Sequence, residues 1–224
     1  MRELVLDTET TGFDPAEGHR IVEIACVELM NHVPTGVTFH RYVNPERDMP
    51  PEAFAVHGLS AEFLAGHPPF QAIVDEFLAF VRDDRLVAHN AEFDMRFINA
   101  ELQRAGRPKL GCAYEDTLAL ARRKFPGAQA SLDALCRRFE IDLSARTKHG
   151  ALLDCELLAA VYLELIGGRQ PGLDLAADAA AGAALAAIDR PHREPRPHAP
   201  TEEELAAHAA MMARLKQPVW LSES

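Results

Sequence analysis

The chain has 224 residues, with 23 lysines and arginines against 34 aspartates and glutamates, so its formal net charge is −11. A chain of this charge repels a phosphate backbone as a whole, which argues against a stand-alone DNA-binding protein. The four cysteines show no C-x-x-C spacing and are expected to be reduced core thiols. No apolar stretch approaches 18 residues, and the first strand begins too close to Met1 for a signal peptide, so we expect a cytoplasmic protein without membrane association.

The first predicted element is a central β-strand. A short apolar run from Glu3 leads into Asp7-Thr8-Glu9-Thr10-Thr11-Gly12, and residue alternation places Asp7 and Glu9 on one face. Two like charges at roughly 4 Å and an effective dielectric constant near 20 repel by about 4 kcal/mol. A cation would offset this repulsion, and Mg²⁺ or Mn²⁺ fits a stretch that offers carboxylates without cysteine or paired histidine. The alternative is a strand end with solvated acids.

Further strands and several helices follow along the chain. β-branched and aromatic residues with short connections predict consecutive antiparallel strands at 20–28 and 37–43. Another strand is expected to end near Ala88. Apolar residues at three- and four-residue spacing predict helices at 70–81, 91–105, 116–124, 131–139 and 151–166. Asp116 and Ser131 are expected to be N-caps, and an α/β domain of about 168 residues can bury most of its apolar surface.

Two of these helices carry acids near their first turns. Asp94 follows His89-Asn90-Ala91-Glu92-Phe93, and on its own it could be an ordinary partner of the helix dipole. Asp154 follows a loop that carries His149. Five residues separate His149 and Asp154, or about 7.5 Å of helix rise, so His149 can stand just beyond a metal site in which Asp154 is a ligand.

Together these motifs resemble those of a known family. The Asp-x-Glu strand at Asp7, the His-Asn-x-x-Phe-Asp segment at His89 and the His-x-x-x-x-Asp helix at His149 resemble the DEDDh branch of the DnaQ-like exonucleases, from residue 3 to about 168. The resemblance implies an α/β fold with a ribonuclease H-like mixed sheet flanked by helices. It also implies a 3′–5′ exonuclease that removes mispaired 3′-terminal nucleotides from DNA, as a proofreading subunit of replicative DNA polymerase III.

The resemblance also implies the catalytic roles. It assigns His149 as the general base, since an imidazole with an unperturbed pKa near 6.5 can take a proton at neutral pH. It implies two divalent metal ions, Mg²⁺ or Mn²⁺, with Asp7 bridging both. The expected metal ligands are Asp7, Glu9, Asp94 and Asp154.

The terminal nucleotide of the DNA 3′ end is expected next to the metal centre. The resemblance implies that Glu52 and His57, in a proline-containing loop, contact this nucleotide. Residues 8–11 offer backbone N–H and hydroxyl groups that suit its 3′-OH. The alternative is that His57 is an exposed turn residue. The expected substrate-binding residues are Asp7, Glu9, Thr10, Glu52, His57 and Asp154.

The residues beyond the catalytic domain indicate partners. Gln170, Leu173 and Leu175 form a Gln-x-x-Leu-x-Leu peptide that resembles those by which bacterial replication proteins bind the sliding clamp, although an ordinary linker is the alternative. The following Ala- and Pro-rich stretch is too poor in large apolar residues to form a core. We therefore expect an exonuclease domain at 1–168, a clamp-binding-like peptide and flexible linker at 169–200, and a helix and tail at 201–224.

The last predicted element is a helix at 201–216. Thr201 and Glu204 are spaced as a capping box, and Leu205 begins an apolar face that continues through Ala209, Met212 and Leu215. The family implies that this face binds the polymerase III alpha subunit, and folding back onto the exonuclease domain is the alternative. Two other functions stay open: a stand-alone DEDDh ribonuclease trimming RNA 3′ ends, and a non-catalytic clamp–polymerase adaptor.

Overall fold

A computed structural model of the chain describes residues 1–144, 146, 148–167 and 199–214. The chain divides into two units, Met1–Leu173 and Asp174–Ser224. The clamp-like peptide at 170–175 and most of the expected linker lie outside the described residues, so these predictions stay open, as do the boundaries at 168 and 200. Within the described ranges, no helix combines the length and the apolar character needed to cross a membrane.

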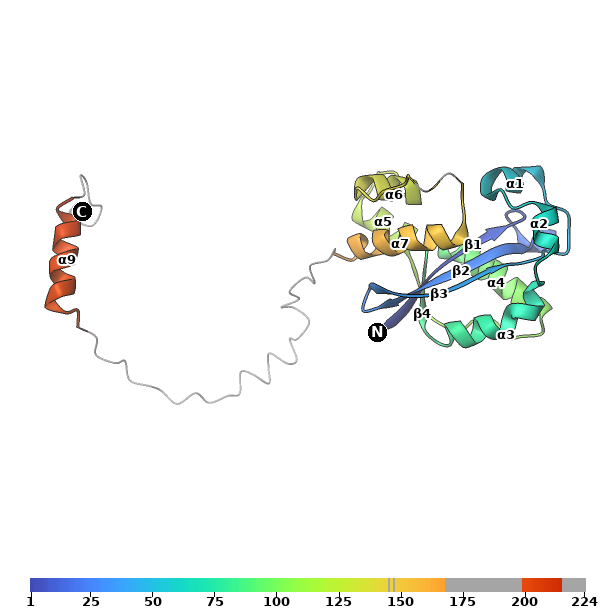
Figure 1. The fold of residues 1–224 in the computed structure, drawn as a ribbon, viewed down its shortest axis with the longest axis horizontal. Helices are drawn as coiled ribbons and strands as arrows, with labels where there is room; N and C mark the ends of the chain where they lie inside the picture. Colours follow the sequence, from blue (N-terminus) through green and yellow to red (C-terminus); the bar gives the residue numbers. More distant parts are fainter. Residues whose placement is uncertain (145, 147, 168–198, 215–224) are drawn as a thin grey trace. The chain divides into compact units, whose positions relative to one another are not determined.

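The first unit is built on a mixed five-stranded sheet with the order β3-β2-β1-β4-β5 (Figure 1). β1 (Arg2–Thr10), β2 (Ile21–Met30) and β3 (Val33–Tyr42) are successive antiparallel strands. β4 (Arg85–Ala88) and β5 (Tyr114–Asp116) join the other edge of β1 in parallel. This arrangement confirms the predicted mixed α/β fold and places the acidic strand β1 at the centre of the sheet.

Helices cover both faces of the sheet (Figure 1). α3 (Phe70–Val81) and α4 (Ala91–Arg104) share one apolar core with Leu4 and Leu6. α5 (Thr117–Lys124), α6 (Leu132–Arg138) and α7 (Ala151–Leu165) share the other with Val5. Successive residues of β1 therefore alternate between the α4 side and the α7 side, as the period of a strand requires. The predicted N-caps are confirmed, because Asp116 accepts from Leu118 N–H and Ser131 from Ala134 N–H.

Some elements differ from the predictions. β3 begins at Val33 rather than residue 37, because Pro34 is tolerated on an edge strand, where a missing N–H need not break a ladder hydrogen bond. β5 has only three residues, too few to show a period. Two short helices, α1 (Pro51–His57) and α2 (Ala61–Ala65), and the 3₁₀ turn η1 (Pro15–Glu17) were not expected either.

The second unit contains α9 (Glu202–Met212). The predicted capping box is confirmed: the Thr201 hydroxyl accepts from Glu204 N–H, and the Glu204 carboxylate accepts from Thr201 N–H at 2.8 Å. The helix ends before the predicted residue 216, and none of its residues is buried. Leu205 and Met211 are exposed on this helix, which leaves open which surface they bind.

Candidate active site

The site begins at the last residues of β1, on the side that faces α7. Asp7 pairs across the strands with Ala25, whose carbonyl oxygen accepts a hydrogen bond from Cys155 Sγ of α7 at 3.4 Å. The small Ala25 side chain lets α7 pack closely on β2, and this packing sets the depth of Asp154 beside the strand. Asp7, His149 and Asp154 consequently line one cavity of about 580 Å³.

Residues from two sequence-distant motifs converge next to Asp7. Glu9, His149 and Asp154 each offer one ligand atom, and these atoms all lie within 4.8 Å of one another. Glu9 and Asp154 are buried, whereas His149 is 49% exposed. A register irregularity after Glu9 marks the end of regular pairing between β1 and β2, a feature that often re-aims side chains near active sites.

Asp94 enters the site from the opposite face of the sheet. It lies in the first turn of α4, which Asn90 starts with a left-handed backbone conformation at φ 67°. Thr8 Oγ1 donates a hydrogen bond to Asp94 Oδ1 at 2.7 Å, and both residues are buried. Thr8 thus fixes Asp94 against the strand that carries Asp7 and Glu9.

This cluster of acids perturbs the protonation of its members. Burial, reinforced by the charges of Asp94, Glu9 and Asp154, raises the pKa of Asp7 well above its ordinary range. Burial and the charge of Asp154 raise the pKa of Glu9 to about 8. Burial raises the pKa of Asp94 to about 7, although the Thr8 hydrogen bond opposes that change. The cluster is therefore short of positive charge, which a bound cation would supply.

Asp154 is the exception, because Arg146 lies against it. Burial alone would raise the pKa of Asp154, but the hydrogen bonds and the positive charge of Arg146 hold it below its ordinary value. Arg146 Nε and Nη2 donate to the two carboxylate oxygens of Asp154 at 2.6 Å each. The other end of the guanidinium, Nη1, donates to Asp133 Oδ1 at 2.6 Å.

A second cavity, of about 400 Å³, adjoins the acids. Glu9, Thr10, Glu52 and His57 all line it. The alternative for His57, an exposed turn residue, is wrong: His57 is the last residue of the helix α1 and is buried. Its Nδ1 accepts a hydrogen bond from Leu59 N–H at 3.0 Å, which leaves the proton on Nε2, a buried atom without a hydrogen-bond partner.

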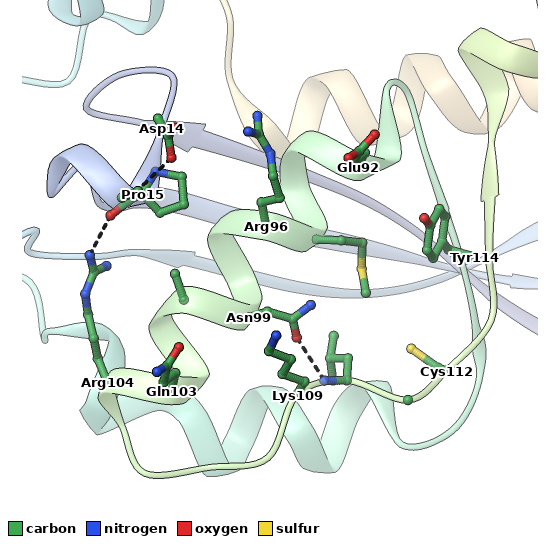
Figure 2. A pocket seen from close by; sticks show the side chains of 15 residues that line it. Asp14, Pro15, Glu92, Arg96, Asn99, Gln103, Arg104, Lys109, Cys112 and Tyr114 are labelled. Atoms are coloured by element: carbon green, nitrogen blue, oxygen red, sulfur yellow. Dashed lines mark hydrogen bonds between the residues drawn. The ribbon is translucent and has the colours of Figure 1, made fainter.

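A larger cavity, of about 890 Å³, lies on the outer side of α4 and contains none of the predicted site residues (Figure 2). Arg104 Nη2 donates to the Pro15 carbonyl oxygen at 3.1 Å, and Leu110 N–H donates to Asn99 Oδ1 at 3.0 Å. These bonds join η1 and the loop after α4 to the helix. Volume alone does not identify the site, because the perturbed carboxylates lie elsewhere.

Comparisons with known proteins identify the family of this chain. A family model described as an exonuclease, RNase_T, matches residues 4–162. DNA polymerase III subunit epsilon from Rickettsia conorii is 47% identical to this chain, over 96% of this chain and 96% of that protein. The Escherichia coli protein of the same name is 45% identical, over 94% of this chain and 92% of that protein. The chain belongs to the DNA polymerase III epsilon subunits. It is a 3′–5′ DNA exonuclease that proofreads, and the DEDDh type to which it belongs is metal-dependent.

Two solved exonuclease structures have a fold similar to that of this chain. Exonuclease X, solved in complex with 5′-overhanging duplex DNA, is 27% identical with a TM-score of 0.58, over 73% of this chain and 90% of that one. The nuclease domain of 3′hExo, a DEDDh family member solved with rAMP, has a TM-score of 0.63 at 18% identity, over 74% of this chain and 91% of that one. Membership also implies a DNA substrate and association with the polymerase III complex.

Sequence reasoning missed two parts of this site. Glu23 of β2 lies directly across from Glu9, is buried, and bonds His40 Nε2 at 2.7 Å. Its signal was an acid inside the apolar run Ile21-Val22-Glu23-Ile24. Arg146 carried no recognisable signal, since an arginine in a polar loop is ordinary.

Proposed function

We propose that this exonuclease holds two divalent cations, Mg²⁺ or Mn²⁺, on Asp7, Glu9, Asp94 and Asp154. The donor set fits, because hard cations prefer carboxylate oxygens and no cysteine sulfur lies among the ligand atoms. The raised pKa values of Asp7, Glu9 and Asp94 support the assignment, since a bound cation would relieve the repulsion that raises them. Such ions, when bound, lower the pKa of a water molecule and stabilise the departing 3′ oxygen.

His149 is the general base in this proposal. Its ring lines the same cavity as Asp7 and Asp154, and its half-exposed position gives the accepted proton a route to solvent. The observation that carries the proposal is that ligand atoms of Glu9, His149 and Asp154 lie within 4.8 Å of one another. His149 and Asp154 are 140 or more residues away from Glu9 in the sequence. A carboxylate already engaged by a cation is a weaker base than this imidazole.

The adjoining cavity is proposed to take the terminal nucleotide. His57 Nε2–H is a buried donor without a partner, and a buried polar group of this kind ordinarily requires one. An oxygen of the nucleotide would satisfy it. Glu9, Thr10 and Glu52 line the same cavity, and a carboxylate oxygen of Glu9 lies within 4.8 Å of Asp154, which lines the adjoining cavity. No array of base-reading side chains is needed, because the pocket has only to accept a frayed strand.

Two further contacts are proposed for the polymerase III complex. Gln170, Leu173 and Leu175 would bind the sliding clamp, and α9 would dock on the alpha subunit. Leu205 on α9 is 54% exposed, which supports an interaction face rather than a core position. Gln170→Ala with Leu173→Ala should abolish clamp binding while nucleotide release by the isolated chain is retained.

The decisive experiment is nucleotide release by the purified chain. The substrates are a 3′-mismatched DNA primer, its matched counterpart and a single-stranded RNA, each with Mg²⁺ and with chelator. We expect metal-dependent release of deoxynucleoside monophosphates, fastest at the mismatch because unpairing there costs less. The Asp7→Ala/Glu9→Ala variant should be inactive. Faster RNA trimming would favour a ribonuclease, and no release from any strand would favour an adaptor.

A further inference from the structure

The guanidinium of Arg146 occupies an unusual position for a side chain in a polar loop. Its side chain is only 9% exposed and contacts two acids from different helices, Asp154 of α7 and Asp133 of α6. The bond to Asp154 is a two-pronged fork, the strongest geometry available to an arginine and a carboxylate. Asp133 is 40% exposed, so one end of the guanidinium lies in the cluster and the other near the surface.

The same guanidinium also contacts the proposed general base. Arg146 Nη2 lies 2.9 Å from His149 Nδ1, and because a guanidinium can only donate, Nδ1 must be the acceptor. The ring proton then resides on Nε2. In this arrangement one positive group engages both oxygens of Asp154 and one nitrogen of His149, which are two of the three residues that converge on the site.

The positive charge of Arg146 also interacts with Glu9 and Asp7. It opposes the rise in the pKa of Glu9, and the charge of Asp7 in turn stabilises the guanidinium. A cation bound by Asp154 would need at least one of the carboxylate oxygens to which Arg146 donates. Two positive groups cannot share those oxygens at hydrogen-bond distance without strong repulsion.

We propose that Arg146 is a positioning residue that serves as an internal counter-cation: it holds Asp154 and His149 while the site lacks metal and is displaced toward Asp133 when a divalent cation binds. This inference rests on the proposed metal centre. Asp133 makes the exchange feasible, because the guanidinium keeps one charge-assisted bond when it leaves Asp154. Metal binding would thereby release the base and the ligand together.

The test is Mn²⁺ affinity of the full chain, measured by calorimetry for wild type, Arg146→Gln and Arg146→Lys. We expect both variants to bind Mn²⁺ roughly tenfold more tightly, since neither can grip both oxygens of Asp154 as the planar fork does. A merely structural role predicts weaker binding. Arg137→Gln is the matched control, because Arg137 lies 3.8 Å from the same Asp133 but is 68% exposed and does not contact Asp154.

The outcomes separate the possibilities. Unchanged or weaker binding by Arg146→Gln would overturn the inference, as would tighter binding by Arg146→Gln with wild-type binding by Arg146→Lys, which would indicate an effect of net charge alone. Failure of the wild type to bind Mn²⁺ would instead overturn the proposed metal centre. In that case the measurement in chelator tests only the ion pair with Asp154: Arg146→Gln should lower Tm by roughly 5 to 10 °C and Arg137→Gln should not.

Discussion

Replacing Glu9 with glutamine should stabilise the metal-free protein at alkaline pH, although it removes a proposed ligand. Glu9 is buried, faces Glu23 across the strands, and has a pKa raised from an ordinary value of 4.5 to about 8. Between these two pH values the folded protein binds a proton at Glu9 that the unfolded chain has released. The free energy of unfolding therefore falls as the pH rises from about 4.5 to about 8.

The size of this effect follows from the two pKa values. One pKa unit corresponds to about 1.4 kcal/mol, so a rise from 4.5 to about 8 corresponds to about 5 kcal/mol of lost stability above pH 8. Glutamine is neutral at every pH and nearly isosteric, so it escapes this loss. Glu9→Gln should be more stable than wild type at pH 8.5 by several kcal/mol, and close to it at pH 4.5.

Urea unfolding in chelator at both pH values measures this difference. Repeating it with saturating Mg²⁺ should reverse the order, because the wild type has all four proposed ligands and gains more stability from the ion. Glu156→Gln on the exposed side of α7 is the control and should change little at either pH. A Glu9→Gln variant no more stable than wild type at pH 8.5 in chelator would refute the reasoning about the cluster's missing charge.

Three other changes test the site and the tail. His149→Ala should lower kcat by about 10² to 10⁴ while Mn²⁺ affinity by calorimetry stays nearly constant; equal losses would make His149 a ligand. Gly12→Ala should raise KM for the DNA end in steady-state assays, because its Cβ would lie 2.3 Å from the His19 ring, which lines the proposed nucleotide cavity. The control Gly111→Ala should leave KM unchanged, because a Cβ at this position meets no atom within 4 Å. Leu205→Glu should weaken alpha-subunit binding in a pull-down and leave nucleotide release unchanged; retained binding would exclude this face.

The sequence predicts the fold well wherever a regular period is long enough to read. The alternation in β1 and the helical spacing of α3, α4 and α7 are long, and their predicted ranges agree closely with the structure. β5 is too short for this, and α1 starts with consecutive prolines that resemble a loop. Pro51 nevertheless suits the first turn of a helix, where a missing N–H costs nothing.

The site was only partly predictable for a related reason. Asp7, Glu9, Asp94, His149 and Asp154 lie in recognisable motifs, and the structure places them around the ends of β1, β4 and α7. The partners that tune them come from positions without motif character. Arg146 matters because of where one loop crosses α6 and α7, and three-dimensional proximity of this kind has no period in the sequence.

The alternation of β1 also restricts how this protein can change. Asp7 and Glu9 face α7, whereas Thr8 between them faces α4 and bonds Asp94. Deleting or inserting one residue upstream in β1 would exchange these two faces, turning the acids toward the apolar core under α4 and the threonine toward the cleavage site. Substitutions can accumulate around the centre one at a time, but the length of the strand before Asp7 is fixed for any descendant that still cuts DNA.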